Sequence, residues 1–242
     1  MKRIILIVIV VSLTALSKAS GQTTTSAPAM PSNFDEMAKK AAKEMKRKVG
    51  IKVGYNFAKL VGNQPNFSPK NQNGFMVAGF YAPPAKGIGY RTELVFSRQG
   101  FSFDESGKMQ NVSQDYIYMP HFTTYTIAKK VQLQAGAQIG YLLNAKKTPE
   151  TKSSANGSTQ EQQITDYMNR IDYGAAAGVE IYPFKGLIIG GRYNVSLGNI
   201  YKQYQTGAST PTPMPVPYPL PVNPNDFKGK NAVVQFFVGY TF

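Results

Sequence analysis

The feature that most constrains this chain is a two-residue alternation of apolar and mixed side chains, which recurs along most of its length. In the last segment, KNAVVQFFVGYTF (Lys230–Phe242), every second residue from Ala232 to Phe242 is apolar. Successive side chains of a β-strand point to opposite faces, so a period of two predicts a strand with two different faces. Eight such strand-like stretches follow one another, and they predict an all-β fold.

The connections between these stretches alternate between long and short. The long ones are Val61–Asn73, Gln99–Ser113, Lys146–Asn169 and Gly198–Gly229, and the short ones are Pro83–Lys86, Ala128–Lys130 and Pro183–Gly186. In an up-and-down meander alternate connections lie at the same end, so the tight turns share one end. This asymmetry is typical of outer-membrane barrels, which have short periplasmic turns. We therefore predict an eight-stranded antiparallel up-and-down transmembrane β-barrel in the outer membrane, with both termini periplasmic.

The composition of the two strand faces indicates which one meets lipid. The apolar parity is large and aromatic, whereas the other is mostly Gly, Gln, Asn, Ser and Ala, which suits the crowded lumen of a narrow barrel. Two stretches, Gly74–Tyr81 and Asp115–Ile127, are ambiguous by parity. We predict girdles of interfacial aromatics at both ends of the barrel. Their residues are Tyr141, Tyr173, Tyr240 and Phe242. A soluble ligand-binding barrel remains the alternative, because alternation alone does not exclude it.

The N-terminal region predicts export from the cytoplasm. Residues 1–21 combine Lys2 and Arg3 with an apolar run too short for a membrane helix and with small residues, as in a signal peptide. A short membrane anchor is the alternative. Residues 22–48 predict a periplasmic linker and a short basic helix, which could also lie on phospholipid headgroups. Residues 49–242 form the predicted barrel domain.

The charge balance limits the predicted partners. The chain has 27 basic and 13 acidic residues, which favours anionic outer-membrane lipid and lipopolysaccharide for an exported protein. No zinc pattern, RNA-binding signature or helix-turn-helix spacing supports nucleic acid. The chain has no cysteine and one histidine, so we expect no metal site and no cofactor. An envelope protein remains a possible partner.

Six charged residues fall on the parity assigned to the lumen, three of each sign. They are Lys52, Arg91, Glu93, Asp172, Glu180 and Arg192. Unpaired charge is costly in a narrow interior, so we expect a balanced network that plugs the lumen, with Arg91, Glu93, Glu180 and Arg192 at its centre. A selectivity ring in an open pore is the alternative.

Two further features could carry function. His121, the one histidine, could serve an enzyme, but no G-x-S-x-G elbow accompanies it, so we expect no catalytic residues. The segment 210–224 has proline at every second position from Pro211 to Pro221, which predicts a stiff spacer or a partner-binding loop. The anchors of such a loop would be Met214, Tyr218 and Leu220.

Four segments carry a resemblance to a known family: RTELVFSRQGF (Arg91–Phe101), DYIYMPHFTTYTI (Asp115–Ile127), QAGAQIGYLLNAKK (Gln134–Lys147) and RIDYGAAAGVEIYPFKGLIIGGRYNVSLGNIY (Arg170–Tyr201). They resemble segments of Bacteroidetes outer-membrane β-barrel proteins of the PorT-like family. Tyr118 and His121 depart from the family pattern. The resemblance implies an eight-stranded outer-membrane barrel whose terminal strand is read by the barrel-assembly machinery. The predicted function is envelope structure or binding through long outer loops; the alternative is a PorT-like component of a secretion or transport machine.

Overall fold

The residues that the structure describes lie mostly in β-strands. The computed structural model describes residues 48–62, 69–85, 87–105, 107–127, 130–149, 161–203 and 228–242. All of them belong to one unit, Met45–Phe242. Among these residues no helix is long and apolar enough to cross a membrane.

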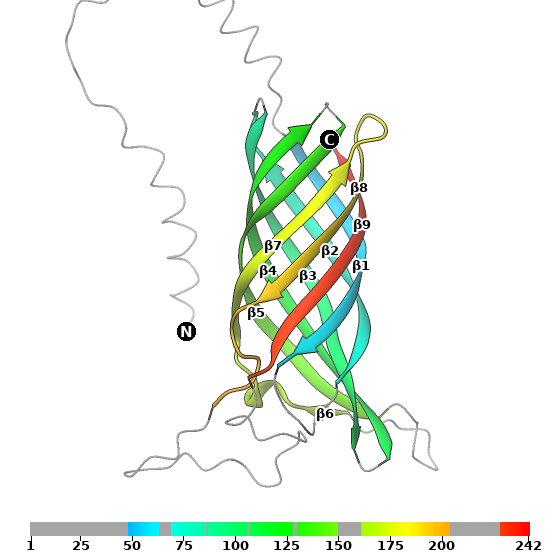
Figure 1. Ribbon diagram of the computed structural model, residues 1–242. Helices are drawn as coiled ribbons and strands as arrows, with labels where there is room; N and C mark the ends of the chain where they lie inside the picture. Colours follow the sequence, from blue (N-terminus) through cyan, green and yellow to red (C-terminus); the bar gives the residue numbers. More distant parts are fainter. Residues whose placement is uncertain are drawn as a thin grey trace, which may run out of the picture. The chain divides into compact units, whose positions relative to one another are not determined.

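Eight long strands form one antiparallel sheet that closes on itself (Figure 1). The strands of the ring are β1 (Lys48–Val61), β2 (Lys70–Ala82), β3 (Ile88–Glu105), β4 (Lys108–Ile127), β5 (Val131–Pro149), β7 (Ile171–Ile181), β8 (Leu187–Ser196) and β9 (Lys230–Thr241). Each strand pairs with its neighbour in this order, and β9 pairs with β1, where Val238 lies opposite Val53. The predicted eight-stranded up-and-down barrel is therefore confirmed. A short strand, β6 (Gln162–Gln163), and a 3-10 turn, η1 (Thr165–Tyr167), lie between β5 and β7.

The apolar parity faces outward, as the sequence predicts. Leu133, Ile189 and Phe236 are 45, 46 and 58 % exposed, whereas Lys52 and Gln235 on the other parity are buried. The two ambiguous stretches also alternate. Met76, Ala78 and Phe80 of β2 and Tyr116, Tyr118 and Phe122 of β4 point inward.

One predicted long loop is wrong. The segment Gln99–Ser113 is a continuation of β3 and β4, in which Gly100 lies opposite Ser113 and Glu105 opposite Lys108. The reversal occurs at Gly107, whose φ of 79° suits glycine, and Asp104 Oδ1 accepts a hydrogen bond from the Gly107 amide at 2.8 Å. The β3–β4 hairpin therefore extends the sheet where we expected an open loop.

The short connections agree with their predicted positions, and the C-terminus lies at their end of the barrel (Figure 1). Gly186, in the turn before β8, has a φ of 86°. Lys48 was assigned to the predicted basic helix, but it is the first residue of β1. The rest of that helix, the linker and the signal peptide lie outside the described residues.

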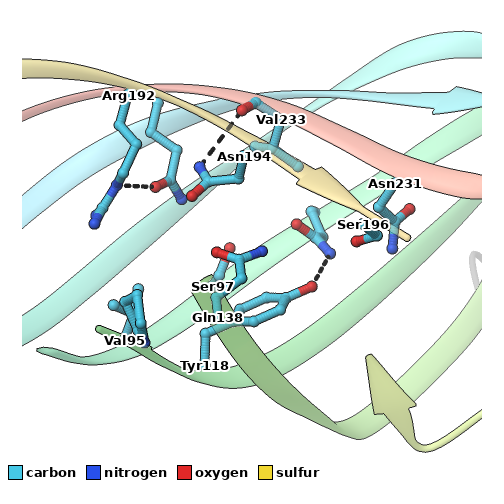
Figure 2. Close-up of a pocket in the computed structure, with 12 residues that line it drawn as sticks. Val95, Ser97, Tyr118, Gln138, Arg192, Asn194, Ser196, Asn231 and Val233 are labelled. Atoms are coloured by element: carbon cyan, nitrogen blue, oxygen red, sulfur yellow. Dashed lines mark hydrogen bonds between the residues drawn. The ribbon is translucent and has the colours of Figure 1, made fainter. Parts of the chain in front are cut away.

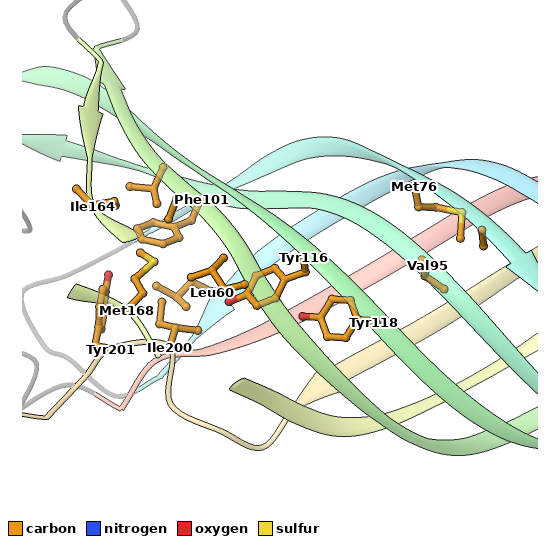
Figure 3. Close-up of a cluster of buried hydrophobic side chains, with 14 of the residues drawn as sticks. Leu60, Met76, Val95, Phe101, Tyr116, Tyr118, Ile164, Met168, Ile200 and Tyr201 are labelled. Carbon is orange, nitrogen blue, oxygen red and sulfur yellow. The ribbon is translucent and has the colours of Figure 1, made fainter. Parts of the chain in front are cut away.

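The interior is more apolar than the sequence suggests. Near the long-loop end, side chains from several strands and from the β5–β7 connection pack into a buried cluster that we call the apolar cap (Figure 3). Its members are Leu60, Phe101, Tyr116, Leu142, Ile164, Met168 and Ile200, each less than 4 % exposed. The prediction of a lumen filled by small and amide side chains is therefore wrong at this end.

Candidate functional site

Five of the six predicted lumen charges meet inside the barrel. We call them the charge layer: Lys52, Arg91, Glu93, Glu180 and Arg192. Lys52 Nζ contacts the Oε1 atoms of both Glu93 and Glu180, and lies 2.6 Å from that of Glu180. Arg91 Nη1 is 2.6 Å from Glu180 Oε2, and Arg192 Nη1 is 2.8 Å from Glu93 Oε2. Each of the five residues is at most 3 % exposed.

Glycines on neighbouring strands make room for these long side chains. Gly239 lies opposite Lys52, and a Cβ atom there would be 2.9 Å from Lys52 Cγ. Gly178 lies opposite Arg192, and a Cβ atom there would be 3.0 Å from Arg192 Cβ. A glycine inside a strand marks a place where another group approaches closely. The glycine-rich inward parity and the inward charges are therefore two parts of one arrangement.

Aromatic rings accompany the surplus positive charge of the layer. Three cations face two carboxylates, so one cation has no carboxylate of its own within the layer. Lys52 Nζ is 5.0 Å from the centre of the Phe80 ring and 4.9 Å from that of Phe237. The Arg192 guanidinium is 5.0 Å from the Phe122 ring centre. Ring faces attract cations at such distances, most strongly where water is excluded.

Asp172, the sixth predicted charge, lies apart from the layer, which corrects the prediction of one network. Its Oδ2 accepts hydrogen bonds from Tyr118 at 2.7 Å and from Ser196 at 2.5 Å, and no ion pair joins it to a described residue. Its carboxyl group is therefore held by hydroxyl groups rather than by a cation. Lys52 also differs from expectation, since it contacts both carboxylates and is as central as the four residues assigned to the centre.

Polar side chains line a small cavity inside the barrel next to Arg192 (Figure 2). Arg192 Nε donates to Gln235 Oε1 at 3.2 Å, and Gln235 in turn donates to Asn56 at 2.9 Å. Gln99 donates to the Tyr118 hydroxyl at 3.0 Å. The cavity between these groups has about 10 Å³ for the centres of water molecules, which corresponds to about one molecule.

The apolar cap closes the interior beyond these polar groups. The segment before β7 folds against β5, because the Ile164 amide donates to the Ala145 carbonyl at 2.9 Å and Thr165 Oγ1 accepts from the Ala145 amide at 2.8 Å. Met168 forms a bridge with Tyr201 and contacts Gln114 through its sulfur at 3.3 Å. Sequence reasoning missed this cap. Its signal was the apolar run of Ile164, Tyr167 and Met168 inside a predicted loop.

The remaining predicted site residues have different outcomes. Tyr141, Tyr173, Tyr240 and Phe242 all lie on the exposed outer surface, although β5 continues past Tyr141 to Pro149. Their place at a membrane interface stays a prediction. His121 lies on the outer side of β4 beside Tyr90. The proposed loop anchors Met214, Tyr218 and Leu220 lie outside the described residues.

Comparison with known protein families assigns the chain to one of them. A family model described as "Outer membrane protein beta-barrel domain" matches residues 35–202. No curated protein matches the chain. The match supports the outer-membrane barrel part of the predicted resemblance; nothing in the comparisons supports the PorT-like family specifically.

Solved structures of bacterial surface barrels are similar at low identity. Ail of Yersinia pestis, in complex with the heparin analogue sucrose octasulfate, is 17 % identical, with 82 % of this chain and 100 % of that chain covered and a TM-score of 0.45. Neisserial surface protein A is 14 % identical, with 80 % and 97 % covered and a TM-score of 0.45. OprG of Pseudomonas aeruginosa is 12 % identical, with 82 % and 97 % covered and a TM-score of 0.43.

Proposed function

The chain belongs to the outer membrane protein β-barrel domain family, and from this premise we propose that it is a non-enzymatic barrel whose lumen is closed to ions. The observation that carries the proposal is the presence of two closures in series, the charge layer and the apolar cap. An eight-stranded barrel has an interior just wide enough for side chains. Its function then lies on its outer surfaces, in envelope structure or in binding through the long-loop end.

The same proposal assigns orientation and partners. The tight turns face the periplasm together with both termini, as in other barrels of this kind. Outer-membrane lipid and lipopolysaccharide surround the wall, and exposed basic residues such as Lys59 and Lys70 lie near the long-loop end, where phosphate groups would meet them. The barrel-assembly machinery reads β9. A protein of the envelope binds the outer loops.

Planar-bilayer recording of the purified full chain tests the closed lumen. We expect no stable single-channel steps, whereas a general porin reconstituted in the same way gives them. Stable steps whose ion selectivity changes in a Glu93→Gln variant would show that ions pass the charge layer, and would overturn the proposal.

A role as a PorT-like component of a secretion machine makes a different prediction. In that case gentle detergent would extract a multi-protein complex that contains this chain. A chain that purifies without other proteins would count against the secretion role and leave the closed barrel intact.

A further inference from the structure

A hollow with a polar and basic lining lies at the long-loop end of β8 and β9. Its volume is about 460 Å³. No acidic residue is among the described residues that line it, and no ion pair joins its two lysines to another described residue. The hollow therefore carries a local excess of positive charge. We call it the basic hollow and define it by five of its lining residues: Asn169, Asn199, Gln203, Lys228 and Lys230.

Hydrogen bonds between main-chain groups hold the sides of the hollow together. The Ile200 amide donates to the Gly229 carbonyl at 2.8 Å, and the Ile200 carbonyl accepts from the Asn169 amide at 2.9 Å. The Asn169 side chain donates two further hydrogen bonds, at 2.8 and 2.9 Å, to carbonyls of the segment that follows β8. Ile200 belongs to the apolar cap (Figure 3), so this row is anchored in the packed interior. Lys228 and Lys230 flank Gly229, and their main chain is therefore positioned before any ligand binds, which lowers the entropic cost of binding.

The basic hollow lies where the apolar outer wall ends. Leu197, just after β8, lines the hollow and is 53 % exposed. Tyr193 of β8 and Val234 of β9 lie opposite each other on the outer wall, and both are exposed. At the start of β9 the outward side chain is that of Lys230 instead. A molecule bound here would meet cations and amides on one side and an apolar wall on the other.

We propose that the basic hollow binds the phosphorylated sugar headgroup of lipopolysaccharide, with the acyl chains lying along the outer face of β8 and β9. Lysine ammonium groups bind phosphate as point charges. The amide side chains of Asn199 and Gln203 contain both donors and acceptors, which suit sugar hydroxyl groups. A free phosphate ion would use the cations but not the apolar border. This assignment rests on the proposed outward position of the long-loop end, and it adds a defined binding site there.

Native mass spectrometry of the full chain in a neutral maltoside detergent tests the site, because it counts the lipid molecules bound to each folded barrel. The probe is lipid A with its phosphate groups, and the matched probe is the same lipid after their removal. We expect the dephosphorylated lipid to bind at least about tenfold more weakly. Lys228→Gln combined with Lys230→Gln should weaken binding of the phosphorylated lipid by a similar factor. The control, Lys108→Gln combined with Lys185→Gln, removes the same charge from exposed lysines elsewhere and should stay within about twofold of the parent chain.

Other outcomes would overturn the assignment. Equal weakening by both pairs of substitutions would show a general attraction between a basic protein and an anionic lipid. Equal binding of the two lipids would show that phosphate is not recognised, and displacement of the lipid by excess inorganic phosphate would identify a free-phosphate site. Each variant is first checked for the compact, heat-sensitive migration of a folded barrel. Lipid binding in detergent depends neither on lumen conductance nor on orientation in the membrane, so its failure is distinguishable from failure of the proposed function.

Discussion

Lys52 is the residue on which both buried carboxylates converge. It lies between Glu93 and Glu180, with the Phe80 and Phe237 rings on its flanks. Removing one partner of a buried ion pair leaves the other charge buried without compensation. The resulting loss of folding stability is larger than the stability that the intact pair contributes. The loss of folding stability caused by a substitution in the charge layer should therefore depend on how much uncompensated charge the substitution leaves behind.

The count of charges predicts which substitution in the layer is worse. Glu93→Gln leaves three cations facing one carboxylate, and we expect it to lower the free energy of unfolding by about 3–5 kcal/mol. Lys52→Met leaves two guanidinium groups facing two carboxylates, so we expect a smaller loss. Denaturant unfolding in lipid vesicles measures both, with exposed Lys59→Met as the control. A loss from Lys52→Met equal to that from Glu93→Gln would contradict the surplus-cation account.

At the scale of the element, strand pairing sets the positions of the side chains. The β3–β4 hairpin shows which strands the alternation of apolar and polar residues can predict and which it cannot. Phe101 and Phe103 alternate with Ser102, and the DESG segment ends at Gly107, so the hairpin had a signal that was interpreted as a loop. Its residues from Gln99 to Phe103 are all buried, which hides the two-faced pattern on which the strand prediction depended.

Gly136 and Gly79 make a matched pair for testing strand packing. A Cβ atom on Gly136 would lie 1.8 Å from the His121 carbonyl oxygen, whereas one on Gly79 meets nothing within 4 Å. We expect Gly136→Ala to push β4 and β5 apart and to reduce the heat-resistant folded fraction severalfold, with Gly79→Ala close to the parent chain. Band-shift electrophoresis with and without heating measures this fraction. Equal behaviour of the two variants would refute the steric argument.

At the scale of the whole molecule, closure of β9 onto β1 gives each of the eight long strands of the ring two neighbours. An unpaired edge in hydrocarbon would cost several kcal/mol for each exposed backbone group, so β9 pairs with β1 along its whole length, from Lys230 to Thr241. The barrel has two different ends: the turns before β3, β5 and β8 lie at one end, and the turn of the β3–β4 hairpin lies at the other.

Thiol labelling of intact cells checks which end faces the outside. Lys108 lies at the start of β4 beside the hairpin turn, and Lys185 lies in the turn before β8; both are exposed. We expect a membrane-impermeant maleimide to label Lys108→Cys in intact cells and Lys185→Cys only after permeabilisation. The cysteine-free parent is the control. The reverse pattern would mean that the tight turns face outward.

The sequence by itself determined that eight strands follow one another, the two faces of those that alternate clearly and the inward position of all six lumen charges, because the two-residue period of a strand is a local property of the chain. It also placed the tight turns before β3, β5 and β8, but not the one at Gly107 between β3 and β4. Only the tertiary structure decided which charges meet, since partners such as Lys52 and Glu180 lie 128 positions apart and are aligned by the stagger of a closed sheet. The same stagger separates Asp172 from the charge layer and brings Met168 and Ile200 into the apolar cap. No local pattern encodes such contacts, because they depend on how the ring closes.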